Sequence, residues 1–209
     1  AHALKDSDPV KAYEIAKTIP KLKRVDDARI ALLAETALGA AEVDDAIAWT
    51  KMLEEGTRDS TLRFKYRLER AELLALQGRI KEAAALLGDL RKGGERLKVR
   101  RSAYRRFLKS RLIRLQHDIA LGAKDTKAAK KSATELLIYY PAEKSSSRAG
   151  LVVDRDSLSI RQKYVRANQL MGAWGYALAR IEFTELVKHK QYQEASKWNL
   201  ALIGLRKLR

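Results

Sequence analysis

The sequence predicts an all-α fold, and three observations support this prediction. Alanine, leucine, lysine, arginine and glutamate dominate the 209 residues, and these are the strongest helix formers. Only three prolines interrupt the chain, and no stretch alternates apolar and polar residues as a strand would. Apolar residues also recur at constant separations. Because 46% of the residues are hydrophobic, the chain can bury a continuous core.

Ten stretches show helical spacing of apolar residues and define the expected elements. They run near residues 8–18, 24–39, 43–55, 60–77, 80–92, 96–121, 126–139, 157–173, 175–189 and 192–207. Asp59, Asp125 and Asp156 each precede an expected helix start, where a side-chain oxygen can cap the first amides. Gly78 and the pair Gly93–Gly94 stand where helices are expected to end, because glycine adopts the left-handed conformation at low cost.

Three of the expected helix pairs share one pattern of small and large apolar residues. Its positions are held by Ala34, Ala37, Val43, Ala46 and Leu53, then by Ala71, Leu74, Ile80, Ala83 and Leu90, then by Ala167, Leu170, Tyr176, Ala179 and Leu186. The second set follows the first by 37 residues and the third follows the second by 96. Small residues on both helices let the backbones approach closely, as in tetratricopeptide-type (TPR-like) pairs of about 34 residues.

The pattern therefore predicts an α-solenoid, a superhelical array of degenerate TPR-like antiparallel helix pairs. Gly78 holds the turn of the second pair, while Ala41 and Trp174 hold the corresponding positions of the other two. An irregular helical bundle is the alternative architecture.

Residues 141–156 lack helical periodicity, and the segment is long for a connection inside a compact domain. We expect it to be a connecting loop between a main helical-repeat array, residues 1–140, and a terminal helical segment, residues 157–209. The last helix presents Trp198, Leu202 and Leu205 on one face. Because a solenoid normally ends in a polar cap, we expect the natural chain to continue beyond residue 209.

The sequence offers no complete catalytic constellation, so we expect no catalytic, cofactor-binding or metal-binding residue and no enzymatic activity in this chain. Cysteine is absent, and no glycine-rich nucleotide-binding loop is present. The three histidines are far apart, and His117 is expected to be an ordinary core or surface residue. Glu182 and Glu185 are expected to face water, and the three tryptophans to fill gaps between helix pairs. No apolar run approaches the length of a membrane span.

The formal net charge is +17, from 43 basic and 26 acidic residues, and it favours an anionic partner. Basic residues are densest between Arg91 and Arg114. The candidate docking surface comprises Arg96, Arg100, Arg101, Arg105, Arg106 and Lys109. A solvated helix face that only supplies solubility is the alternative interpretation. Sequence-specific recognition of nucleic acid is not expected, because no recognition helix, aromatic sheet motif or zinc module is present.

Several stretches are similar to a known family in their order along the chain. They are the segment 28–34, the segment 70–78 with Glu82-Ala83-Ala84 behind it, the helix 135–141 that ends in Tyr-Tyr-Pro, and the Arg-Ala helix at 166–170 before the Glu-Phe helix at 176–183. This order resembles the N-terminal superhelical region of soluble lytic murein transglycosylases. The Glu-Ser motif and the Gly-Leu-Met-Gln string of that family's catalytic domain are both absent, so no catalytic residue is transferred.

The resemblance implies a repeat region that positions a cell-wall enzyme on peptidoglycan in the periplasm. The residues alone leave two other hypotheses open. One is a free-standing TPR-like adaptor that binds a peptide or partner protein. The other is a non-specific binder of an anionic polymer, such as nucleic acid, through the basic helix.

Overall fold

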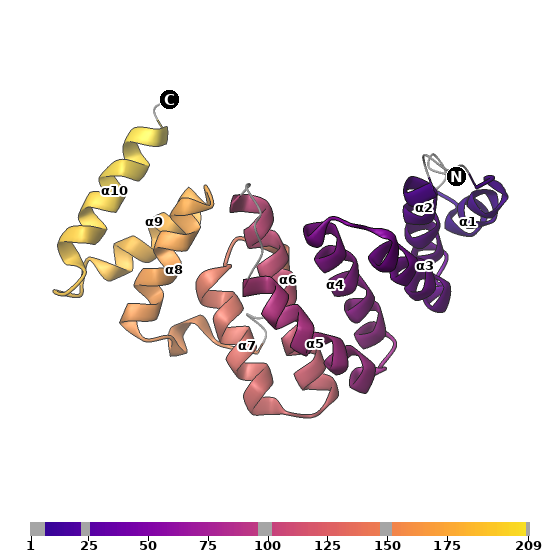
Figure 1. Ribbon diagram of the computed structural model, residues 1–209. Helices are drawn as coiled ribbons and strands as arrows, with labels where there is room; N and C mark the ends of the chain where they lie inside the picture. The colour runs from indigo at the N-terminus through magenta and orange to yellow at the C-terminus, as the bar shows by residue number, and fades with distance from the viewer. Residues whose placement is uncertain (1–6, 22–25, 96–101, 147–151, 208–209) are drawn as a thin grey trace. The chain divides into compact units, whose positions relative to one another are not determined.

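The computed structural model describes residues 7–21, 26–95, 102–146 and 152–207 (Figure 1). All regular structure in these ranges is helical, which confirms the predicted all-α class. The chain divides into two compact units, Ala1–Leu108 and Lys109–Arg209. The division expected at residues 141–156 stays a prediction, because residues 147–151 lie outside the described ranges.

Within the first unit, each helix from α1 to α4 packs against the next one along the chain. Its helices are α1 (Pro9–Thr18), α2 (Asp26–Gly39), α3 (Val43–Gly56), α4 (Ser60–Leu76), α5 (Ile80–Glu95) and the first turns of α6 (Ser102–Gly122). Tyr13 of α1 packs with Leu33, Ala37 and Ala46 in one buried cluster. The small side chains bring α2 and α3 together, and the large ones fill the remaining space.

The second unit begins within α6, and its described residues form four further α-helices. They are α7 (Thr126–Tyr139), α8 (Ile160–Gly172), α9 (Tyr176–Leu186) and α10 (Gln193–Lys207), with the single-turn helices η2 (Lys144–Ser146) and η4 (Arg155–Ser157) between α7 and α8. Phe183 and Leu186 of α9 pack with Ala167 of α8 and Ile203 of α10. A second cluster joins Ile113 of α6 to the buried face of α7.

Helix starts follow the predicted caps with one exception. Asp59 and Asp125 accept hydrogen bonds from first-turn amides, as expected. The helix expected from residue 157 instead begins at Ile160, so the prediction that Asp156 caps it is wrong. Ser159 and Gln162 form a reciprocal capping box there, which satisfies amides at both positions.

The prediction that α5 ends before Gly93–Gly94 is also wrong, because the helix runs on to Glu95. A Cβ atom at Gly93 would lie 3.2 Å from the ring of Phe64 on α4. This glycine therefore serves the close approach of two helices rather than a helix end.

Four helix pairs turn through the same backbone conformation. Ala41, Gly78, Lys124 and Trp174 have φ angles of 63°, 76°, 59° and 65°, and they join α2 to α3, α4 to α5, α6 to α7 and α8 to α9. In each turn the following residue donates its backbone N–H to a carbonyl five residues earlier. These bonds are Glu42 to Ala37 (2.9 Å), Arg79 to Leu74 (2.9 Å), Asp125 to Ala120 (2.8 Å) and Gly175 to Leu170 (2.8 Å). This is the Schellman helix ending.

When positions are counted from the left-handed residue of each turn, the four pairs can be compared residue by residue. The second helix of each pair carries a fully buried alanine five residues after that point: Ala46, Ala83, Ala129 and Ala179. Seven residues before it stand Ala34, Ala71 and Ala167, but the α6–α7 pair has His117 instead. His117 is buried, and its Nδ1 lies 2.9 Å from the Ala129 carbonyl oxygen. The imidazole ring of His117, which is larger than the alanine of the other pairs, thus contacts a backbone carbonyl of α7.

Candidate functional site

Only half of the predicted docking surface lies within the described residues. Arg96, Arg100 and Arg101 fall outside them, whereas Arg105, Arg106 and Lys109 lie on α6. Arg105 is exposed, and the other two are half-buried. Arg105 and Lys109 are four residues apart and share one face of the helix. Both Arg105 and Arg106 also interact with other groups of the protein.

The apolar stripe that the sequence predicts on α6 is buried where the structure describes it. Leu108, Leu112, Leu115 and Ile119 are all buried. Leu97, expected on the same stripe, lies outside the described residues. Leu112 follows Lys109 by three residues and Arg105 by seven, so both cations border the buried stripe of α6 rather than lying opposite it.

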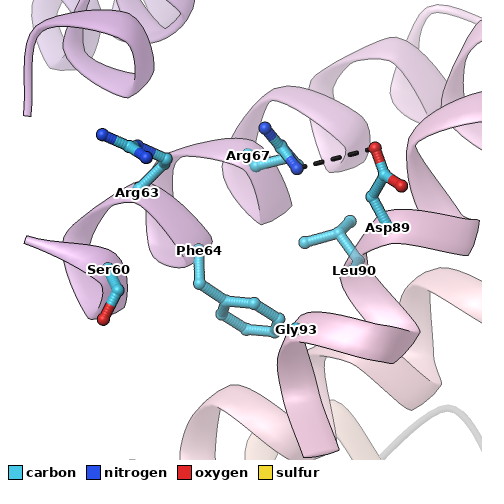
Figure 2. A pocket seen from close by; sticks show the side chains of 7 residues that line it. All are labelled: Ser60, Arg63, Phe64, Arg67, Asp89, Leu90 and Gly93. Atoms are coloured by element: carbon cyan, nitrogen blue, oxygen red, sulfur yellow. Dashed lines mark ion pairs between the residues drawn. The ribbon is translucent and has the colours of Figure 1, made fainter. Parts of the chain in front are cut away.

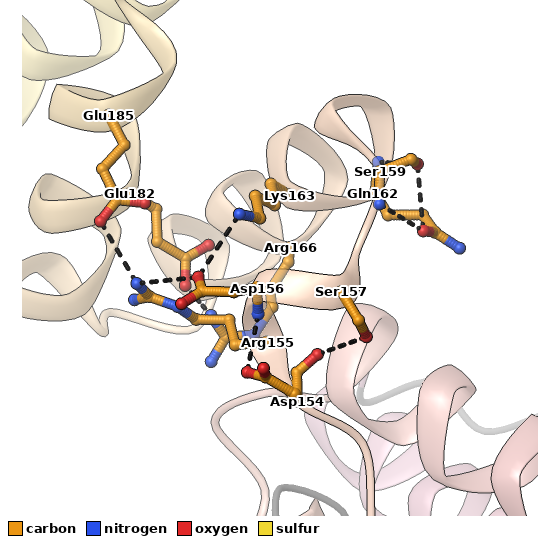
Figure 3. Close-up of polar contacts among 10 residues, drawn as sticks. All are labelled: Asp154, Arg155, Asp156, Ser157, Ser159, Gln162, Lys163, Arg166, Glu182 and Glu185. Carbon is orange, nitrogen blue, oxygen red and sulfur yellow. Dashed lines mark hydrogen bonds and ion pairs between the residues drawn. The ribbon is translucent and has the colours of Figure 1, made fainter.

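A buried ion pair joins α8 to α9 in the second unit (Figure 3). The Arg166 guanidinium pairs with the Glu182 carboxylate, and its Nε donates to the Leu137 carbonyl oxygen of α7 over 3.0 Å. The side chains of Arg166 and Glu182 are 12% and 5% exposed. The expectation that Glu182 faces water is therefore wrong, because its place on α9 points it at a cation on α8. Burial lowers the pKa of Arg166 from its usual value.

Weaker pairs surround this buried contact. Arg155 reaches Glu185 over 3.2 Å, and Lys163 reaches Asp156 over 3.5 Å (Figure 3). General acid chemistry needs a carboxyl group that can give up a proton at a reaction centre. Glu182 and Glu185 are instead paired with arginines. This cluster therefore joins the helices of the second unit.

The first unit also contains a buried carboxylate that pairs with arginines. The Glu54 carboxylate is 6% exposed and contacts Arg67 Nε at 2.6 Å and Arg70 at 3.0 Å. Arg67 also reaches Asp89 of α5 over 3.6 Å. Charged groups on α3, α4 and α5 are thus linked through one arginine.

A small hollow opens between α4 and α5 (Figure 2). Its volume is about 130 Å³, and it is lined by Ser60, Arg63, Phe64, Arg67, Asp89, Leu90 and Gly93. This is below the range of about 300–1,000 Å³ that small-molecule sites occupy. Arg63 donates to the Thr57 carbonyl oxygen at 2.7 Å, and Arg67 is paired with Asp89. Both cations of the hollow are therefore engaged within the protein.

The tryptophans divide into one structural residue and two exposed ones. Trp49 is half-buried and donates from Nε1 to the Tyr13 hydroxyl at 3.2 Å, as expected of a gap-filling residue. Trp174 and Trp198 are 78% and 67% exposed, so the same expectation is wrong for both. Trp174 stands in a turn outside the packed faces. Trp198 lies on α10 away from the buried Ile203.

Within the described ranges, no three histidine, aspartate or glutamate side chains gather closely enough to hold a metal ion. No helix of the described chain is both long and apolar enough to cross a membrane. No protein-family model, no curated protein and no solved structure matches the sequence or the fold.

Proposed function

We propose that this chain is a non-catalytic binding module, an α-solenoid of TPR-like helix pairs that engages an anionic partner. The observation that carries this proposal is the common geometry of the four pairs, each with a Schellman turn and a fully buried alanine at the same place. Repeated pairs of one geometry stack through equivalent faces and leave extended surfaces for binding. The described carboxylates that are buried are paired with arginines, so they serve packing rather than catalysis.

The partner is anionic, because the chain carries a net charge of +17 and several basic residues on α6. The family resemblance makes this partner peptidoglycan, whose stem peptides carry carboxylates. The module then positions a lytic transglycosylase on the cell wall in the periplasm. That assignment rests on the sequence motifs alone.

A co-sedimentation experiment with purified peptidoglycan sacculi tests the proposal. The intact chain should pellet with sacculi at low salt and less at high salt, because screening weakens surface charge interactions. The triple variant Arg105→Glu, Arg106→Glu, Lys109→Glu should stay in the supernatant.

The matched control reverses three exposed lysines on the next helix, Lys127→Glu, Lys130→Glu and Lys131→Glu. It changes the net charge equally and should still pellet. Equal loss in both variants would show that net charge alone drives binding, and retention in both would remove α6 from the interface. Binding to single-stranded DNA as tight as to sacculi would identify a general polyanion binder instead.

A further inference from the structure

Trp174 is an unusual residue for the place that it occupies. Its φ angle is 65°, a conformation that bulky residues rarely adopt, and its side chain is 78% exposed. The equivalent turns hold Ala41, Gly78 and Lys124, so the turn itself does not require an aromatic ring. Because glycine would fit the turn better and the ring contributes little to the core, the tryptophan points to a role at the surface.

Two neighbours build a fixed surface beside this ring. The Tyr176 ring centroid lies 6.0 Å from that of Trp174, with the planes inclined at 60°. Arg206 of α10 donates from its guanidinium to the Tyr176 hydroxyl at 2.7 Å and lies 5.6 Å from that ring's centroid. We call Trp174, Tyr176 and Arg206 the aromatic platform. All three belong to the second unit, and the arginine holds the tyrosine in place.

The chain segments that carry the platform are free of acidic residues. No aspartate or glutamate occurs between residues 157 and 181, or between residues 195 and 209. Arg180 and Arg206 are both exposed. These two segments therefore contribute basic residues and no carboxylate, so they favour a ligand with negative charge.

We propose that the aromatic platform binds a pyranose ring of a carboxylate-bearing glycan strand. This inference rests on the proposed function and names the part of the polymer that the chain contacts. Two rings inclined at 60° cannot clamp a flat nucleobase between parallel faces. They form a corner that accepts a chair-shaped sugar, with its apolar C–H groups against the electron-rich ring faces.

Arg206 supplies the contact to the charge. A guanidinium carries five N–H donors, and only one bond of Arg206, to Tyr176, is needed to orient it. The remaining donors can take a carboxylate on the sugar or on its substituent. The platform thus combines stacking for the ring with a charge-assisted hydrogen bond for the anion.

The test uses the intact chain and soluble glycan-strand fragments of purified peptidoglycan, with binding followed by calorimetry. Trp174→Ala should weaken binding about tenfold, because one stacked ring contact is lost. The matched control is Trp198→Ala, which removes another exposed tryptophan and should bind like the unaltered chain. Trp198 precedes Arg206 by eight residues on α10, or about 12 Å along the helix axis. Arg206→Gln should weaken binding to the anionic fragments more than binding to neutral chitooligosaccharides, because only the anionic fragments lose the contact to their charge.

Unchanged affinity in Trp174→Ala, or equal losses in Trp174→Ala and Trp198→Ala, would overturn the platform. So would oligothymidylate that binds more tightly than the glycan and depends on Trp174, since the platform would then stack bases. Circular dichroism of each variant establishes that it is folded. If the unaltered chain pellets with sacculi while Trp174→Ala also pellets and binds fragments normally, only the platform fails. If the unaltered chain does not pellet at all, the proposed function fails.

Discussion

The α4–α5 pair and the α8–α9 pair share a turn but differ in the residue that makes it. Both use the Schellman hydrogen bonds and both bury an alanine completely on each helix. One turn residue is Gly78 and the other is Trp174. The comparison shows that the turn constrains the backbone and the buried alanines constrain the packing, while the turn side chain points outward and is free to serve another purpose.

Breaking the ion pair that links α8 to α9 should have the largest effect on stability. Arg166→Met leaves the Glu182 carboxylate buried without its cation, which should cost about 3–5 kcal/mol of unfolding free energy. The double variant Arg166→Met, Glu182→Met should recover most of the loss, because no buried charge remains. Urea denaturation of both variants measures this. A loss below about 1 kcal/mol in the single variant would mean that Glu182 reaches water.

Enlarging the buried alanine of the α4–α5 pair should have the next largest effect. Ala83→Leu inserts three carbons where Ala83 is 0% exposed, so it should destabilise the chain by about 1–3 kcal/mol. The control is Ala84→Leu, one residue on at an exposed position, which should change stability little. Similar unfolding midpoints for the two variants would contradict the close approach of α4 and α5.

Exchanging the turn residues should produce smaller effects of opposite sign. Gly78→Ala forces a side chain into a left-handed turn and should cost about 1 kcal/mol, with no steric clash, since nothing lies within 4 Å of the added Cβ. Trp174→Gly should stabilise the α8–α9 pair by a similar amount. Denaturant titrations of the two variants provide the measurement. A Trp174→Gly variant less stable than the unaltered chain would show that the ring supports the fold after all.

The smallest expected effect is on the pH dependence of the unfolding free energy, through Tyr13 in the first unit. Burial raises the pKa of Tyr13, and the bond that its hydroxyl donates to Asp45 at 2.6 Å raises it further. The neutral phenol therefore stabilises the folded chain fully below 10.0, the ordinary tyrosine pKa, and this contribution is lost as pH rises through the higher folded-state pKa. Between pH 10.0 and that folded-state pKa, the unfolding free energy should fall less steeply with pH in Tyr13→Phe than in the unaltered chain. Identical slopes would contradict the assignment.

The helices and three of the four pairs could be predicted from sequence because apolar spacing and capping residues act locally. The α6–α7 pair was missed as a repeat for two reasons. Its turn at Lys124 follows Gly78 by 46 residues rather than 37, and His117 replaces the expected alanine. A comparison of small residues at constant offsets therefore does not detect this pair. The buried Ala129, five residues after Lys124, shows that the pair follows the same pattern as the other three.

Side-chain environments were harder to predict than helices. The burial of Glu182 depends on its ion pair with Arg166 on α8. The spacing of residues within α9 cannot predict a partner on another helix. Trp174 is expected from sequence to fill a gap between helix pairs, but it stands in a left-handed turn and its side chain is exposed. On α6 the predicted apolar stripe is buried, because it follows from helical periodicity, but Ile113, His117 and Ala120 outside that stripe are buried as well. The docking surface itself stays a prediction.

Small-angle X-ray scattering on the intact chain tests most directly whether the helix pairs stack as an open array. A compact domain of 209 residues has a radius of gyration of about 17 Å. A solenoid, in which each pair contacts only its neighbours, should give a clearly larger value and an asymmetric distance distribution. A radius of about 17 Å with a symmetric distribution would contradict the solenoid and favour an irregular helical bundle.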